Sequence, residues 1–200
     1  AIYDPLSPNG YAGSISSIGT ASAGNPVGVR NLNRDLDQND YIQLNLGAEV
    51  KIIEGLSYKM SFGLNSDNRY NDTFIPNYDF GTGYTVETPR IYQFRSRSNQ
   101  VVMNNLLNFT RQFGLHDVAV LVGQSSERTL YKSLGGSNLE LPSANVDALD
   151  LGIGTRNSYG LVRENTLLSY FGRVSYNYAS KYFLEGSLRK DGSSRFGPSN

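Results

Sequence analysis

The chain has 200 residues, enough for one domain with a sizeable core, and its 18 Lys and Arg residues balance 18 Asp and Glu residues. A net charge of zero offers no general attraction for nucleic acid. The lack of cysteine excludes disulfides, thiolate metal sites and cysteine nucleophiles. The 14 Tyr, 9 Phe and 21 Gly residues suit strands joined by turns, so we expect an all-β protein with no nucleic-acid partner.

Neither a transmembrane helix nor a leader peptide is visible in the sequence. The longest apolar run, Val118–Val122, has five residues, whereas a spanning helix needs about 20. The chain begins Ala1-Ile2-Tyr3, without a basic or apolar leader segment. We therefore expect either that a leader has been removed or that the chain is an internal piece of a longer protein.

Residues 1–40 are rich in Gly, Ser, Asn and Pro, and the stretch SPNGYAGSISSIGTASAGNP shows no sustained period. A composition of this kind is typical of a loop. We predict that residues 1–40 form a loop segment, extracellular in the interpretation that follows.

From Asp40 onward, apolar and polar residues alternate in three paired stretches. The first alternation pauses at Ile53-Glu54-Gly55 and then resumes, which predicts an antiparallel hairpin with a tight connection. The same unit recurs with turns at Phe113–Asp117 and Ala179–Lys181. We predict six long strands in three hairpins, over residues 41–66, 97–128 and 166–192, joined by long polar loops at about 66–91 and 127–165.

The predicted strands are long for a soluble protein. Each runs 11 residues or more, where a tilted membrane-crossing strand needs about 9 to 11 and a soluble strand about 5 or 6. Short turns alternate with long loops, as in bacterial outer-membrane barrels, which have about 8 strands or more. We therefore predict that residues 41–200 are a segment of a larger antiparallel transmembrane β-barrel, with short periplasmic turns and long extracellular loops.

The two faces of the first hairpin differ in chemistry. We expect the apolar face to meet lipid and the polar face to line a water-filled lumen. The residues expected toward lipid are Leu44, Leu46, Val50, Tyr58, Met60 and Phe62, and those expected toward the lumen are Gln43, Asn45, Glu49, Lys51 and Lys59. Tyrosines near the short turns would form an aromatic girdle, namely Tyr58, Tyr176, Tyr178 and Tyr182. The alternative is that aromatic residues are simply good strand formers.

A soluble, secreted β-sandwich that binds glycans, as an adhesin or lectin does, is the alternative to the barrel. It would need polar outer faces, so the face that carries Leu56, Met60 and Phe62 would have to be buried. An enzyme is not expected, because the sole histidine, His116, has neither a cysteine nor a second histidine to complete a catalytic or zinc site. We predict that His116 is a solvated turn residue.

Arginines and an aromatic residue cluster near the start of one predicted strand. Arg95 and Arg97 accompany Tyr92, so this group is our candidate for contact with an anionic substrate or a saccharide ring. Lipopolysaccharide contacts and ordinary strand-end charges are the alternatives.

An acidic stretch, DLDQND, is the candidate for metal binding. Asp35, Asp37 and Asn39 are spaced like the start of a calcium loop. However, Asp40 and Leu46 stand where an EF-hand needs Gly and a bidentate Glu. An irregular calcium site and a solvated acidic loop are the two interpretations, and no other cofactor is expected.

The C-terminal run LLSYFGRVSYNYASKYFLEGSLRKDGSSRFGPSN closely resembles the barrel of SusC/RagA-type TonB-dependent outer-membrane transporters of Bacteroidota. In that family a strand of this type turns into another that ends in RxDGSSRFG. The matching residues here are Arg189, Asp191, Gly192, Ser193, Ser194, Arg195, Phe196 and Gly197. NPVGVRNLN, IIEGLSYKMSFG and NNLLNFTRQFGLHDVAVLVG also resemble the family, so the likeness covers most of the chain from about residue 25.

The resemblance implies an importer of the bacterial outer membrane, driven by TonB, with a barrel of about 22 strands closed by a plug. It also implies a SusD-like lipoprotein at the extracellular mouth, lipid and lipopolysaccharide around the wall, and oligosaccharides or peptides as substrates. We see no plug, no segment that contacts TonB and no end of the barrel in this sequence, and we expect specificity to reside in the long loops, the plug and the lipoprotein.

Within RKDGSSRFG, Arg189 and Asp191 share strand parity, so we expect them to lie on one side and to pair. Gly192-Ser193-Ser194 lets the backbone bend away from the sheet. We expect this stretch to stabilise the outer rim, with ligand contact as the alternative.

Overall fold

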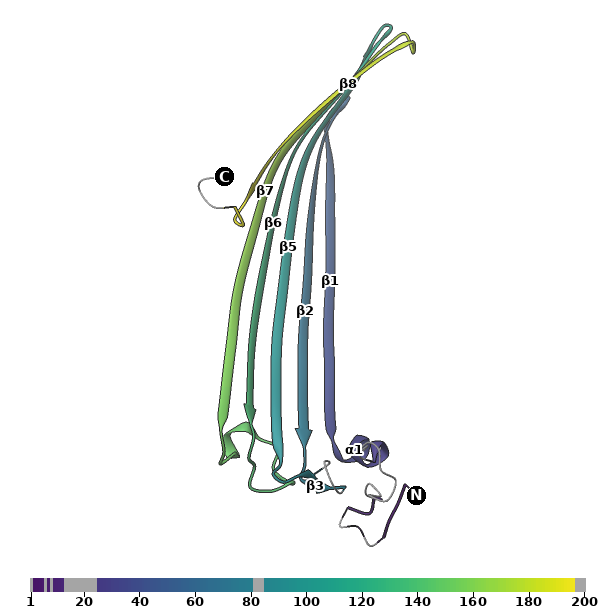
Figure 1. Cartoon of the computed structure of the whole chain (residues 1–200). Helices are drawn as coiled ribbons and strands as arrows, with labels where there is room; N and C mark the ends of the chain where they lie inside the picture. The colour runs from purple at the N-terminus through teal and green to yellow at the C-terminus, as the bar shows by residue number, and fades with distance from the viewer. Residues whose placement is uncertain (1, 6, 8, 13–24, 81–84, 197–200) are drawn as a thin grey trace. The chain divides into compact units, whose positions relative to one another are not determined.

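The computed structural model describes residues 2–5, 7, 9–12, 25–80 and 85–196. They form one six-stranded sheet, in the order β1-β2-β5-β6-β7-β8, and one two-stranded sheet of β3 and β4 (Figure 1). The long strands neighbour one another in chain order, which is the arrangement that successive hairpins produce. The elements are α1 (Pro26–Leu32), β1 (Arg34–Ile53), β2 (Leu56–Ile75), β3 (Tyr78–Asp79), β4 (Thr85–Val86), β5 (Arg90–Phe113), β6 (His116–Asn138), the 3-10 turn η1 (Leu149–Leu151), β7 (Arg156–Tyr178) and β8 (Tyr182–Ser193).

The six strands and their short turns agree with the sequence, but the strands are longer than the alternation indicates. β2 continues to Ile75 and β6 continues to Asn138, so both predicted long loops are shorter than expected. Polar residues occupy both faces of these extensions, and a strand with two polar faces shows no period of two.

The prediction of a loop over residues 1–40 is wrong for its last part, while residues 1, 6, 8 and 13–24 lie outside the described residues. Residues 26–32 form α1 and β1 begins at Arg34. The Asn25 side chain accepts hydrogen bonds from the backbone N–H groups of Val27 and Gly28, both at 3.1 Å. Asn25 followed by Pro26 is a helix start, which the loop-like composition of the segment concealed.

The chain divides into two compact units. The first, called the loop unit, consists of Ala1–Asn39, Asn68–Ser96 and Ser133–Leu161. The second, called the hairpin unit, consists of Asp40–Asp67, Arg97–Lys132 and Val162–Asn200. The long connections belong to the loop unit and the three short turns to the hairpin unit.

The loop unit contains a small apolar core. Phe74, Ile91 and Leu141 are buried together, with Leu149 packed against them. Phe80 forms a second buried contact in the same unit, since its ring stacks on Tyr78 with centroids 4.8 Å apart. This core anchors the ends of the long connections.

The hairpin unit exposes its large apolar side chains. Leu46 and Val50 on β1 are each 58% exposed and Leu188 on β8 is 81% exposed. The described residues form one large sheet and one of two strands, so they do not form the two facing sheets of the alternative β-sandwich. No helix in the described part of the chain is long and apolar enough to cross a membrane.

Two of the short turns of the hairpin unit accept backbone hydrogen bonds from neighbouring segments, one from strand β5 and one from another turn. The N–H of Thr110 donates to the carbonyl of Gly55 at 2.7 Å, and the N–H of Ala179 donates to the carbonyl of Leu115 at 2.7 Å. Gly55 has a φ of +78°, and a Cβ there would lie 2.3 Å from the Thr110 oxygen. Only glycine fits this position without movement of the neighbouring strand.

Candidate functional site

A row of polar side chains crosses four strands of the hairpin unit. The Tyr41 hydroxyl donates to Asn65 Oδ1 at 3.4 Å, and Asn65 Nδ2 donates to Gln100 Oε1 at 3.0 Å. Gln100 Nε2 then donates to Glu127 Oε1 at 2.8 Å. The row therefore connects β1, β2, β5 and β6 on one face of the sheet, which we call the polar face.

A second row lies on the polar face. Asn104 Nδ2 donates to Ser61 Oγ at 3.1 Å, and Ser125 Oγ donates to Asn104 Oδ1 at 2.6 Å. Strand alternation places the residues expected toward the lumen on this same face: Gln43, Asn45, Glu49 and Lys51 share the parity of Tyr41, and Lys59 shares the parity of Ser61. The sequence therefore assigned these residues to one face, but it did not predict the cross-strand rows.

The polar face of β7 and β8 carries paired charges. Arg173 NH2 lies 2.5 Å from Glu185 Oε2, with both side chains more than half exposed. Arg189 Nε donates to both Asp191 oxygens, at 2.9 and 3.1 Å, so the predicted pairing of these two residues is confirmed. Because exposed ion pairs contribute little to stability, their main effect is to present donors and acceptors to water or to a polar solute.

The opposite face, called the apolar face, contains the residues expected toward lipid. Polar groups on it pair across strands: Tyr58 OH donates to Asn105 Oδ1 at 2.6 Å, and Asn105 Nδ2 donates to Gln124 Oε1 at 2.8 Å. Polar groups removed from water need such partners, so this row makes the Asn105 amide, which is paired through both its oxygen and its nitrogen, compatible with an apolar surrounding.

Aromatic rings gather at the short turns of the hairpin unit. The His116 ring lies 4.9 Å from the Tyr178 ring between centroids, and His116 Nδ1 lies 2.5 Å from the Tyr176 hydroxyl. The Tyr178 ring stacks on Tyr182 at 6.4 Å. The prediction of His116 as a solvated turn residue is incomplete: it is exposed, but it begins β6 and packs within this aromatic group.

The three candidate substrate residues all lie on β5 and do not form one cluster. Arg95 is paired with Asp72 through two contacts, at 2.5 and 2.7 Å, and its hydrogen bonds with that carboxylate raise its pKa. Tyr92 is three residues away on the other face of the strand. Arg97 is exposed and belongs to the hairpin unit. The charge of Arg95 is therefore already balanced, and substrate contact by these residues stays a prediction.

The candidate calcium residues lie on a strand, not in a loop. Asp35, Asp37 and Asn39 are alternate residues of β1 and are spread along one side of it. Asp37 also accepts from Arg69 Nε at 3.0 Å and NH2 at 2.6 Å, and these hydrogen bonds lower the pKa of its carboxyl group. No group of three His, Cys, Asp or Glu side chains suited to a metal occurs in the described ranges. Calcium binding stays a prediction.

The loop unit has a polar hollow that sequence reasoning missed. It has a volume of about 530 Å³, and its charged lining residues are Arg30, Arg34, Asp35, Asp72 and Asp147. Arg34 NH1 lies 3.3 Å from Asp147 Oδ2, and its Cζ lies 4.3 Å from the centroid of the Phe74 ring. These residues come from α1, two strands and a connection distant in sequence, so no local motif indicates the hollow.

No family model matches the chain, but curated relatives do. The chain is 29% identical over 188 residues to TonB-dependent receptor P3 of Formosa agariphila, covering 93% of this chain and 18% of that protein. It is 31% identical over 157 residues to TonB-dependent receptor P39 of the same organism, covering 74% and 14%. TonB-dependent receptor SusC of Bacteroides thetaiotaomicron is 24% identical over 178 residues, covering 88% and 17%. The chain spans less than a fifth of the length of these relatives.

Solved structures share the fold. The RagAB peptide importer in the closed-closed state matches 99% of this chain and 22% of its own chain, with a TM-score of 0.83 and 21% identity. The RagAB peptide transporter matches 94% and 21%, with a TM-score of 0.82 and 19% identity. At these identities the likeness concerns the fold, so the six-stranded sheet is a segment of an antiparallel β-barrel.

Proposed function

Since this chain belongs to the SusC/RagA-type TonB-dependent receptors and supplies part of their β-barrel, we propose that the full-length protein is an importer of the bacterial outer membrane. The observation that carries this proposal is sequence similarity to a TonB-dependent receptor over nearly the whole chain. The named relatives are receptors and transporters, not enzymes.

The chemistry of the hairpin unit supports a place in a membrane wall. Asp40–Asp67, for example, contains the end of β1, a short turn and the start of β2. Each of these two strand segments is long enough to cross a membrane, since a tilted membrane strand needs roughly 9 to 11 residues. One face carries hydrogen-bonded polar rows and charged pairs, while the other exposes large apolar side chains. Such a division suits a water-filled lumen on one side and lipid on the other.

We propose oligosaccharides or peptides as the imported solutes, with a SusD-like surface lipoprotein as partner and TonB as the source of energy. The support is the name SusC of one relative and the description of RagAB as a peptide importer. In this proposal the short turns are periplasmic and the loop unit is extracellular, so its polar hollow is available to solute.

Cell fractionation tests the membrane proposal. The full-length protein is expected in the outer-membrane fraction and is expected to migrate differently in gels before and after heating, as folded barrels do. Recovery as a soluble monomer without detergent would contradict the proposal.

Growth experiments test the solute. A strain that lacks the gene is expected to grow normally on simple nutrients and poorly on one class of oligosaccharide or peptide, with recovery when the gene is restored. Equal growth of the deletion and parent strains on every oligosaccharide and peptide supplied would count against import of either class.

A further inference from the structure

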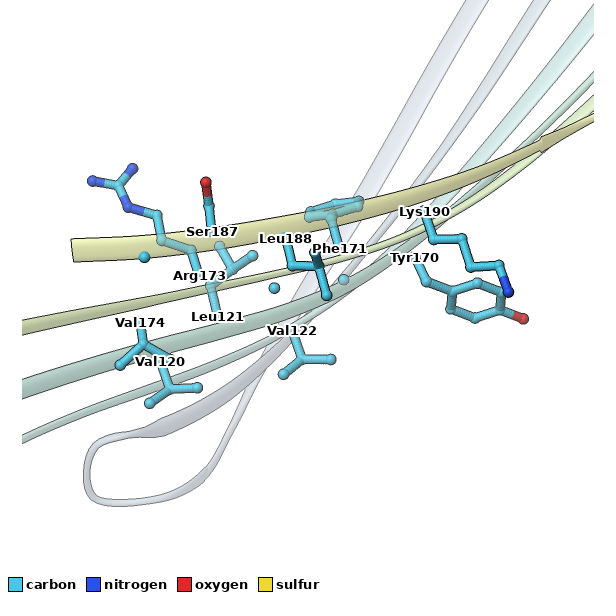
Figure 2. A pocket seen from close by; sticks show the side chains of 13 residues that line it. Val120, Leu121, Val122, Tyr170, Phe171, Arg173, Val174, Ser187, Leu188 and Lys190 are labelled. Atoms are coloured by element: carbon cyan, nitrogen blue, oxygen red, sulfur yellow. The ribbon is translucent and has the colours of Figure 1, made fainter.

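The apolar face of the hairpin unit is hollowed where β6, β7 and β8 lie side by side. This groove, called the β6–β8 groove, has a volume of about 640 Å³. Figure 2 shows Val120, Val122, Val174 and Leu188 directed to one side of the strands, and Arg173 directed to the other. The groove walls are therefore mainly valine, leucine and backbone.

Two glycines create the space. In the β7–β8 pairing, Gly172 lies opposite Leu188 and Gly186 lies opposite Val174, so side chains are missing at two diagonal positions of the apolar face. A Cβ added at Gly186 would meet nothing within 4 Å. The opening is thus a gap that a side chain could fill without a clash.

A tyrosine and a lysine close one end of the groove. Tyr170 and Lys190 are cross-strand partners on the apolar face, and Figure 2 shows both directed to the same side as the valines. Lys190 is eight residues from Tyr182, which begins β8 at the short turn. At about 3.3 Å per residue and a tilt of about 40°, this separation corresponds to roughly 20 Å across the membrane. The apolar band of a barrel is about 25 Å tall with aromatic girdles at both edges, so Lys190 lies near the headgroup level remote from the turns.

The ammonium group of Lys190 lacks an acidic partner within the described part of the chain. The carboxylates of β8, Glu185 and Asp191, lie on the polar face and pair with Arg173 and Arg189. A cation therefore stands at the end of an apolar groove, and the one carboxylate of β7 on the same face, Glu164, pairs with Arg128.

We propose that the β6–β8 groove holds an acyl chain of an anionic lipid whose phosphate pairs with Lys190. The apolar walls match the chain, and the lysine and the Tyr170 hydroxyl match the headgroup. The inference rests on the proposed function, because it requires the apolar face to meet lipid. With the short turns in the periplasm, the groove end at Lys190 faces the outer leaflet, and the lipid is lipopolysaccharide.

The test measures lipopolysaccharide bound to the full-length protein. The protein is extracted from outer membranes in mild detergent, delipidated and titrated with purified lipopolysaccharide, and bound lipid is counted by native mass spectrometry. Lys190→Gln is expected to weaken binding about tenfold, because it removes one charge-assisted contact. Gly186→Leu, which fills the groove, is expected to weaken binding similarly, whereas Lys190→Arg keeps it.

Matched controls lie on the polar face. Lys59→Gln removes a lysine there, and Gly47→Leu adds a side chain at a glycine whose nearest neighbour would be 3.8 Å from the new Cβ. Both are expected to bind lipopolysaccharide like the parent protein. Equal binding by the parent, Lys190→Gln and Gly186→Leu would overturn the inference. So would an unphosphorylated lipid that binds as tightly as lipopolysaccharide, or a dimer that forms in place of bound lipid and is lost in Lys190→Gln.

Fractionation of the same variants separates the two proposals. If the parent protein is in the outer membrane and no variant affects lipid binding, only the groove assignment fails. If the parent protein is recovered without detergent as a soluble monomer, the proposed function fails first.

Discussion

Replacement of Gly55 by alanine should destabilise the barrel through two separate effects. Gly55 has a left-handed φ of +78°, which costs alanine about 1 to 2 kcal/mol. The added Cβ would also lie 2.3 Å from the Thr110 carbonyl oxygen, so the turn that holds Gly55 and strand β5 must move apart. That movement breaks the hydrogen bond from Thr110 N–H to the Gly55 carbonyl, which contributes about 0.5 to 1.5 kcal/mol. The total loss is expected to be about 1.5 to 3.5 kcal/mol.

Gly114 provides a matched control. It also occupies a short turn of the hairpin unit and has a positive φ of +60°, but a Cβ there would meet nothing within 4 Å. Gly114→Ala should therefore lose only the stability that the left-handed backbone conformation costs alanine, about 1 to 2 kcal/mol. The difference between the two variants isolates the contact between Gly55 and Thr110 of β5.

The measurement is denaturant unfolding of the full-length protein in detergent, with the folded fraction determined from gel mobility before heating. Gly55→Ala should lose about 1 kcal/mol more than Gly114→Ala. Equal losses in the two variants would show that the Gly55 turn is not held against β5 as described, and a neutral Gly55→Ala would contradict the backbone argument as well.

Three further predictions concern a turn, a face and an ion pair. Ser180 has a left-handed φ of 56°, so Ser180→Gly should stabilise the protein by about 0.5 to 1 kcal/mol and Ser180→Ala should not, as measured by the same unfolding experiment. Phe62→Arg, in the middle of the membrane part of β2, should lower the free energy of unfolding by about 2 to 4 kcal/mol, because it places a charge in lipid. Gln43→Arg on the polar face should change it by no more than about 0.5 kcal/mol. Similar losses in the two variants would contradict the assignment of Phe62 to the lipid side and Gln43 to the lumen side. Arg69 lowers the pKa of Asp37, which lies in the loop unit, so the pair stabilises the fold above the ordinary Asp pKa of 3.8 and that contribution is lost as the pH falls through the lowered pKa. Asp37→Asn should remove this part of the acid dependence of unfolding, and an unchanged profile would argue against the pair.

Local sequence determined the strands of the hairpin unit and their faces. Residues 44–64 alternate around Glu54-Gly55, and the structure has β1 and β2 joined at those residues. The pairing of Arg189 with Asp191 was predictable for the same reason, since residues two apart in a strand lie on one side. Successive side chains of an extended chain point to opposite faces because of its covalent geometry. The faces of a strand can therefore be predicted from its own sequence, without knowledge of the strands beside it.

The extent of the strands could not be read in this way. The end of β2, residues 68–75, has polar residues on both sides and shows no apolar period. Backbone hydrogen bonds to neighbouring strands make it a strand, and those bonds are invisible in the local pattern.

Only the tertiary structure decided which polar residues meet. Gln100 reaches Asn65 and Glu127, which are 35 and 27 residues away in sequence, and Arg34 reaches Asp147 across 113 residues. The same holds for the groove, because Gly172 and Gly186 form one gap only in the observed β7–β8 register. The physical reason is that a strand's faces depend on its own backbone, whereas the register between strands depends on turn lengths and on the hydrogen bonds that join the strands.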